Sequence, residues 1–276
     1  MAIHLGGSSR NSLAATREVL DKSLAGLSGD AASALSTDLF AVVNALGQNV
    51  ALRRAITDPS RHAEEKEALL KELFGSRISD KALAIAAGAV SKRWSSPSDL
   101  LIAMEQVAIE AEAGAANTRD ELDDLESEIF AFGRALAANQ DLRNALNGNP
   151  DAVAEKKALV DQVLKSATSS TRALVGQVVN GLWGRSIESA LSDIAHATAA
   201  HRSLVVAHVQ SAIELTADQK AKLASALSKQ VGQAVRVNVE TNPKVVGGVS
   251  IRFRDELIDG TVISRMAEAS QALAGK

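Results

Sequence analysis

Apolar residues up to about residue 200 recur at steps of three and four positions, the spacing that places side chains on one face of an α-helix. Two segments show this spacing: Leu35, Leu39, Val42 and Leu46 in the first, and Leu122, Leu125, Ile129, Phe132 and Leu136 in the second. The pattern predicts an N-terminal part built from amphipathic helices.

Two helix starts are predicted from capping residues. Thr118 has Glu121 three positions later, the pattern of a capping box, and Ser96 is followed by Pro97, which suits the first turn of a helix. We therefore expect helices to begin at Thr118 and at Ser96.

Helix stops are predicted at Asp58-Pro59 and at 147–150, where the sequence reads Asn-Gly-Asn-Pro. Each stop separates a long helix from a second amphipathic helix, and these second helices are expected to begin near Ala63 and Val153.

Past Arg202 the apolar spacing changes to that of β-strands. Three strands are expected, at 204–209, at 235–239 with strict alternation, and at 249–253. Thr216 and Gln219 form a capping box that opens a helix through about Val231.

Turns and a last helix complete this C-terminal part. Asn242-Pro243 and Gly247-Gly248 turn the chain between the second and third strands, and a final helix is expected at 261–273. The order β-α-β-β-α predicts a small α+β module whose sheet is covered on one face by helices.

The helical part contains an internal repeat. Residues 35–69 match residues 125–159 without a gap, and twelve of thirty positions between 40 and 69 are identical. With a one-residue slip, the match extends to the two tryptophans, Trp94 and Trp183. Such a period is longer than that of solenoid repeats and indicates a duplicated domain. We expect a mainly α protein with two homologous helical bundles, 5–110 and 113–200, followed by the α+β module at 203–276.

Composition narrows the class of protein. Apolar residues make up 46% of the chain but aromatic residues only 3%, so its cores must be built from Ala, Leu, Val and Ile. The net charge of −3 is not that of a nucleic-acid-binding protein. The absence of cysteine fits a reducing cytoplasm. The N-terminus lacks the pattern of a signal peptide, and no apolar run is long enough to span a bilayer.

Possible sites for nucleotides, metals or catalysis each have a structural alternative that we favour. Gly247-Gly248 leads into a strand rather than a helix, unlike a phosphate-binding loop. His196 and His201 are five positions apart with no evident third ligand, so we predict helix-surface or domain-junction residues and no metal. His208 is expected to pack within the first strand.

Charged runs and residues shared by both repeats also have a functional and a structural interpretation. The acids and lysines of 64–67 and 155–157 are expected to form a solvated helix face rather than a catalytic pair. Arg53 and Arg143 recur in both copies, where they either contact a partner or pair within the bundle. The two tryptophans are expected to fill the bundle cores. No catalytic residue, cofactor or metal is predicted.

The C-terminal residues resemble a known family. Its pattern is a strand ending in Ser-Ala, as in 203–212, a Pro-x-x-x-Gly-Gly turn into a strand, as in 243–251, and an Ile-Asp-Gly-Ser step, matched at 258–261 with Thr261 in place of Ser. This pattern is similar to that of the F-type ATP synthase delta subunit, or oligomycin-sensitivity-conferring protein. Residues 113–276 resemble one ordinary delta subunit. The first bundle, residues 5–110, resembles the additional N-terminal bundle of the long delta subunits of actinobacteria.

The resemblance implies a non-catalytic stator subunit of a proton-translocating ATP synthase. Its expected partners are the N-terminal helices of alpha subunits, bound by the helical bundle, and the b subunits of the peripheral stalk, bound by the C-terminal module. The expected location is the cytoplasmic face of the cell membrane, held through the complex without a transmembrane segment. The alternative is a helical adaptor of an unrelated cytoplasmic complex.

Overall fold

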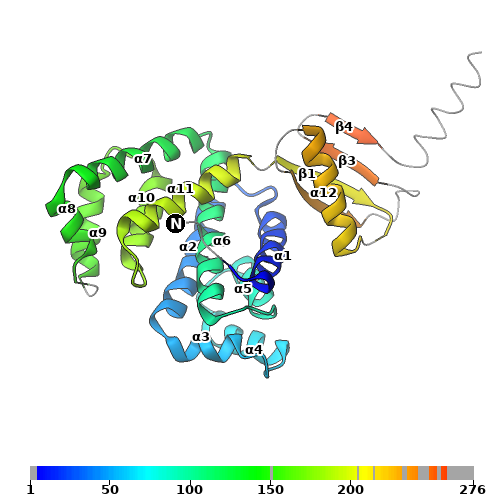
Figure 1. Cartoon of the computed structure of the whole chain (residues 1–276), viewed down its shortest axis with the longest axis horizontal. Coiled ribbons are helices and arrows are strands. Elements are labelled where there is room, and N and C mark those ends of the chain that lie inside the picture. The colour runs from blue at the N-terminus through cyan, green and yellow to red at the C-terminus, as the bar shows by residue number, and fades with distance from the viewer. Residues whose placement is uncertain are drawn as a thin grey trace, which may run out of the picture. The chain divides into compact units, whose positions relative to one another are not determined.

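The computed structural model describes residues 5–149, 152–203, 205–213, 215–231, 235–241, 249–253 and 256–259. These ranges are mainly helical, as the apolar spacing predicts (Figure 1). The chain divides into two compact units, Met1–His201 and Arg202–Lys276.

The first unit is entirely helical in its described residues. Its helices are α1 (Gly7–Leu24), α2 (Gly29–Gln48), α3 (Val50–Thr57), α4 (Ala63–Phe74), α5 (Asp80–Val90), α6 (Pro97–Thr118), α7 (Leu122–Ala138), α8 (Gln140–Asn147), α9 (Val153–Val163), α10 (Ser169–Asn180) and α11 (Ile187–Ser203).

Helix α6 lies between the helices that precede it and those that come after it (Figure 1). It packs on α1, α2 and α5 of the first repeat and on α7 and α10 of the second. Between Leu100 and Ala116 its buried residues occupy every side of the helix. A helix that is buried on all sides is typical of the centre of a larger core. Helix α6 is therefore shared by both repeats, as the last helix of the first and the first helix of the second.

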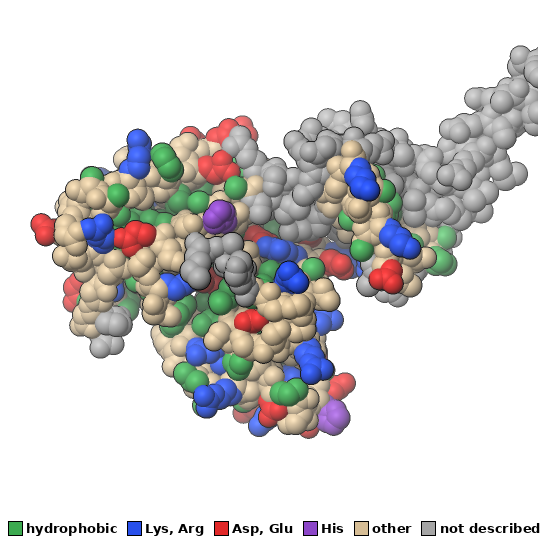
Figure 2. Space-filling view, viewed as in Figure 1, with side chains coloured by type: hydrophobic (Ala, Val, Ile, Leu, Met, Phe, Trp, Pro, Cys, Tyr) green, Lys and Arg blue, Asp and Glu red, His purple; other side chains and the backbone are tan. Residues whose placement is uncertain are grey.

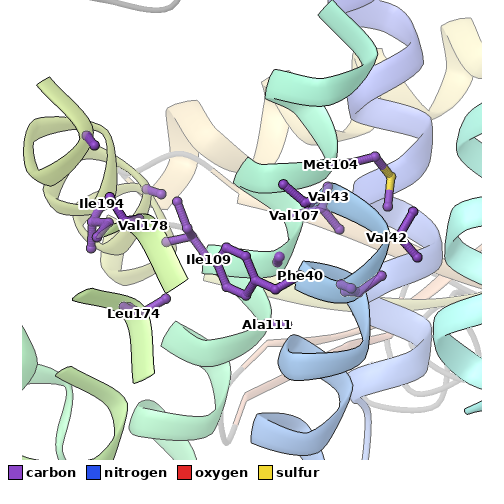
Figure 3. Close-up of a cluster of buried hydrophobic side chains, with 14 of the residues drawn as sticks. Phe40, Val42, Val43, Met104, Val107, Ile109, Ala111, Leu174, Val178 and Ile194 are labelled. Atoms are coloured by element: carbon purple, nitrogen blue, oxygen red, sulfur yellow. The ribbon is translucent and has the colours of Figure 1, made fainter. Parts of the chain in front are cut away.

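The apolar residues of both repeats form one continuous buried cluster. Figure 3 shows Phe40 and Val43 on α2 close to Ile109 and Val107 on α6, with residues of α10 and α11 on the other side of α6. Most of the side chains are small aliphatic ones, as the low aromatic content requires. Because α6 continues past residue 110, no loop separates the two repeats there. Their division into domains at 5–110 and 113–200 stays a prediction.

The predicted stops are confirmed. Helix α3 ends at Thr57 and α8 at Asn147, and the next helices begin at Ala63 and Val153. The break just before α3 and α8 is an addition to the prediction. The side chains of Asn49 and Asn139 accept hydrogen bonds from the amides of Leu52 and Leu142, both at 3.0 Å, and so cap α3 and α8.

One predicted helix start is wrong. Thr118 is the last residue of α6, and its hydroxyl donates to the carbonyl of Gly114 inside that helix. The next helix begins at Leu122, after Asp120, whose φ is 59°. Burial of the alanines near the end of α6 extends the helix over the expected capping residue. The start at Ser96 is confirmed, because its side chain accepts from the amide of Asp99.

The second unit contains a four-stranded sheet in its described residues. Its elements are β1 (Val205–Ser211), α12 (Ala217–Val231), β2 (Val235–Thr241), β3 (Val249–Phe253) and β4 (Glu256–Asp259). The strand order is β2-β1-β3-β4. Strand β1 pairs with β2 in parallel, with Val209 opposite Val239, and antiparallel with β3, with Val209 opposite Ile251.

Helix α12 connects the parallel pair and packs on β2. The capping box at its start is confirmed: the amide of Thr216 donates to the side chain of Gln219, and the amide of Gln219 donates to the hydroxyl of Thr216. Leu227 of α12 packs with Val209, Val235 and Val237 in a small core. The three expected strands are present, and β4 is an addition. The turns at 242–243 and 247–248 and the helix at 261–273 lie outside the described residues.

Candidate partner-binding surfaces

The described residues contain no group of three or more His, Cys, Asp or Glu side chains placed to hold a metal ion. Within the same ranges, every helix is too short or too polar to pass through a lipid bilayer. Acidic and basic side chains are interspersed on the face of the helical unit seen in Figure 2. We therefore compare the equivalent helix surfaces of the two repeats.

One line of side chains along α2 joins the two repeats. We call it the α2 strip: Ser33, Ser36, Phe40, Asn44 and Gly47. These positions are three or four apart and so share one face of the helix.

The contacts of the α2 strip are made with α6 and with the second repeat. The hydroxyl of Ser33 donates to Glu112 at 2.7 Å, and that of Ser36 donates to the carbonyl of Ala108 at 2.8 Å. The Asn44 amide lies 3.5 Å from the Gln177 side chain of α10. Phe40 is only 3% exposed.

The last position of the α2 strip is covered by a tryptophan of the second repeat. A Cβ at Gly47 would lie 2.3 Å from the ring of Trp183, so any larger residue there requires the ring to move. The same ring lies against Gly181, and Trp183 itself has a φ of 50°, a region that a non-glycine residue adopts only at a cost. The expectation that both tryptophans fill the bundle cores therefore holds for Trp94, which is buried, whereas Trp183 packs between the repeats.

The equivalent line on α7 is exposed at its last three positions. We call it the α7 strip: Asp123, Glu126, Phe130, Arg134 and Ala137, each ninety positions after its counterpart in the α2 strip. Phe130 is 67% exposed, against 3% for Phe40. The guanidinium of Arg134 lies over the Phe130 ring, 5.1 Å from its centroid. The same residue type at the same repeat position is thus covered in one copy and uncovered in the other.

The buried acids of α6 form ion pairs and hydrogen bonds with residues of both repeats. Helix α6 carries three buried acids, Glu105, Glu110 and Glu112. Glu110 binds Arg17 of α1, whereas Glu112 binds Ser33, Arg119 and Ser170. The Arg119 guanidinium also donates to the hydroxyl of Ser170 on α10 at 2.7 Å. Losing one partner of such a cluster leaves the other charge unpaired in the interior, which is costly.

The third acid, Glu105, binds a residue of the loop before α11. Arg185 donates to Glu105 at 2.6 Å and to Asp193 at 2.8 Å. Burial raises the pKa of Glu105, although the positive charge of Arg185 opposes the shift. This cluster holds the start of α11 against α6.

The repeated arginines pair within the helical unit. Arg53 donates to the carbonyls of Leu46 and Gly47 at the end of α2. Arg143, at the same repeat position, lies 3.8 Å from Glu188 of α11. Of the two readings of these arginines, pairing within the bundle is the one that the geometry supports.

The prediction of a solvated face at the starts of α4 and α9 is wrong for one residue in each. Glu65 and Glu155 are exposed, but Lys66 and Lys156 are 7% and 5% exposed. Lys156 donates to the carbonyl of Gly148 at the end of α8, 3.3 Å away. The long lysine stem packs along the core while its ammonium group reaches a free helix end.

Lys66 acts at the corresponding break of the first repeat. The pKa of Asp58 is lowered, first because the hydroxyl and amide of Ser60 donate to it and further because Arg61 and Lys66 are positively charged. The presence of lysine at this position in both repeats, as Lys66 and Lys156, is the sequence feature that indicates a structural role. Of the two histidines weighed as metal ligands, His196 is exposed on α11, and the side chain of His201 lies outside the described residues, as does that of His208, which is expected to pack within the first strand.

Comparison with known proteins covers both repeats and the sheet module. A family model described as the ATP synthase delta (OSCP) subunit matches residues 110–273. A protein named ATP synthase subunit delta from Streptomyces coelicolor is 39% identical over 269 residues, which is 97% of this chain and 98% of that protein. Proteins of the same name from Parafrankia sp. and Acidothermus cellulolyticus are each 38% identical, over 97% of this chain and 99% of theirs. The family match begins inside α6, whereas the relatives also cover the first repeat.

Proposed function

Because this chain belongs to the ATP synthase delta (OSCP) subunit family, we propose that it is a stator subunit of a proton-translocating F-type ATP synthase. It is a structural subunit rather than a catalytic one. The observation that carries the proposal is the similarity of the whole chain, both repeats included, to proteins named as delta subunits.

A stator has to resist torque. Rotation at the centre of the enzyme would carry the catalytic head with it unless a static link held the head to the membrane sector. A link of this kind works only if it does not bend under load. The shared helix α6, with the ion pairs that Arg119 and Arg185 make with its buried acids, joins the two repeats in one continuous core, which suits such a load.

The assembly is a hetero-oligomer with alpha and b subunits. We assign the helical repeats to the N-terminal helices of alpha subunits and residues 203–276 to the ends of the b stalk. Docking of a partner helix suits a bundle of short helices with aliphatic side chains. The sheet module would then contact the stalk, and the protein would lie at the cytoplasmic face of the membrane, held there by its partners.

Purification of the native assembly tests this function. The full chain, tagged at its N-terminus and expressed from its own locus, is recovered from detergent-solubilised membranes. We expect the alpha and b subunits in stoichiometric amounts, and loss of the b subunits when residues 203–276 are deleted. Recovery of the chain without either subunit would refute the proposal. Mass spectrometry of the recovered proteins supplies the measurement.

The alternative function is that of a helical adaptor in an unrelated cytoplasmic complex. It is not favoured, because the similarity to delta subunits extends over nearly the whole chain rather than over the C-terminal module alone. The same purification separates the two, since an adaptor would be recovered with other proteins and without alpha subunits.

A further inference from the structure

The internal repeat provides a template for the covering of the α7 strip. Its counterpart, the α2 strip, packs on α6, the last helix of its own repeat, and is covered at Asn44 and Gly47 by Gln177 of α10 and by Trp183, which belong to the second repeat. In the described part of the chain, no third helical repeat comes after the second one, because α11 leads into β1 instead. The second repeat therefore has, among the described residues, no following repeat to supply the contacts that Gln177 and Trp183 supply to the first.

A surface helix that needs no partner on its outer side has a polar outer face there. The α7 strip does not have one at its centre, because Phe130 is 67% exposed and is followed along the same helix by exposed alanines at 131, 135, 137 and 138. A large aromatic side chain in such a position is typical of an interface anchor rather than of free surface.

The positions that differ between the strips indicate the chemistry of the occupant. In the α2 strip, Asn44 meets the neutral side chain of Gln177, and Phe40 belongs to a cluster with aliphatic side chains of α6 and α10 (Figure 3). In the α7 strip, Arg134 stands where Asn44 stands. A guanidinium group pairs best with a carboxylate, in a planar two-bond geometry.

From these observations we propose that the α7 strip is a docking surface for an amphipathic helix of a partner subunit, which covers Phe130 with aliphatic side chains and meets Arg134 with a carboxylate. That the partner is another subunit of the ATP synthase rests on the proposed function. The geometry of the strip itself comes from the repeat and does not depend on it.

A second copy of this chain is the other occupant to consider. The α7 strip would have to dock on a different surface of the next copy, because the two sides of the template contact are not the same. Such a head-to-tail contact leads to rings or open filaments rather than to a two-fold dimer. We therefore commit to a partner subunit, and the free chain is expected to be a monomer.

Photo-cross-linking in the intact assembly tests this inference. The full chain carries p-benzoylphenylalanine at position 130, and a second version carries it at Val50, another apolar residue that is 49% exposed. After irradiation of cells, we expect position 130 to cross-link to a helical segment of another subunit with an acid within one turn, and Val50 to give much less product.

The outcomes are distinguishable from those of the functional test. If the chain is recovered with alpha and b subunits but position 130 gives no cross-link, the docking surface is refuted and the proposed function stands. A cross-link only to this same chain, within it or to a second copy, also refutes it. If alpha and b subunits are absent, the function fails, and a cross-link at 130 to a helix of some other protein would still support the docking surface.

Substitutions supply an independent readout in the full chain. Phe130→Ser and Arg134→Glu should each weaken association with the partner by about tenfold or more, the size expected of an anchor residue and its charged neighbour. Both residues are exposed, so circular dichroism and the melting temperature of the free chain should be unchanged. Val50→Ser, at an exposed apolar residue outside the strip, is the matched control. Undiminished association of both variants would overturn the proposal.

Discussion

The two repeats share the residues that build their own helices and differ where each meets its surroundings. Asn49 and Asn139 cap equivalent helices, and Lys66 and Lys156 are buried at equivalent breaks. Phe40 and Phe130, by contrast, are the same residue in opposite environments. Residues that are identical in the two repeats thus reflect their common local fold. The environment of each repeat depends instead on the helices that come after it in the chain.

The largest expected effect contrasts the two phenylalanines. Phe40→Ala should cost about 3–5 kcal/mol of unfolding free energy, because it leaves a cavity in the shared core. Phe130→Ala should change the stability of the free chain by less than about 0.5 kcal/mol, because that ring is mostly in solvent. Urea denaturation of the two variants provides the measurement. Similar losses in both would end the distinction between the strips.

A smaller effect is expected where Trp183 lies over the α2 strip. Gly47→Ala should destabilise the chain by about 1–3 kcal/mol, because its Cβ would overlap the indole ring and force it to move. The counterpart in the second repeat is already alanine, at the exposed position 137.

A double-mutant cycle with Trp183→Leu sharpens this result. The cost of Gly47→Ala should fall when the large ring is absent, which would show up as a coupling energy between the two positions. Thermal denaturation of the four variants measures it. Strictly additive losses would mean that Trp183 does not restrict Gly47.

The helix caps should behave alike in both repeats. Asn49→Ala and Asn139→Ala each remove a side chain that accepts from a helix amide at 3.0 Å, so each should cost about 1 kcal/mol. Chemical denaturation checks both. A loss confined to one copy would show that the shared residues do not have the same role.

The smallest effect concerns pH and the charge cluster at Glu105. Its pKa is raised by burial above the ordinary value of 4.5, so the folded state favours the protonated form. The resulting stability is full below the unfolded pKa and is lost as the pH rises through the folded pKa. Relative to Glu105→Gln, which does not titrate, the natural chain should therefore gain stability as the pH falls from neutral toward about 4. Melting curves across this range test the sign, and a relative loss on acidification would contradict it.

Much of the local structure can be predicted from short-range patterns. The stop at Asp58, the start at Ser96 and the reciprocal bonds of Thr216 and Gln219 depend on residues close in sequence, and all three are found. Thr118 shows the limit. Its capping pattern is outweighed by burial along α6, a contribution that comes from helices distant in the chain.

The surfaces could be predicted less well than the elements. The sequence shows that Phe40 and Phe130 are equivalent, and equivalence alone suggests equal burial. Their difference arises because α6 and α10 cover one strip, and that contact depends on how two repeats pack. The burial of Lys156 has a similar origin: its charge suggests solvent, but the carbonyl of Gly148 at a helix end provides a partner inside.

Hydrogen–deuterium exchange of the free chain and of the chain within the purified ATP synthase compares the two strips in one experiment. The segment 33–47 should exchange slowly in both states, because the second repeat already covers it. The segment 123–137 should become markedly slower only in the assembly, where a partner helix covers Phe130. Unchanged exchange of 123–137 between the two states would contradict the assignment of the α7 strip as a partner-binding surface.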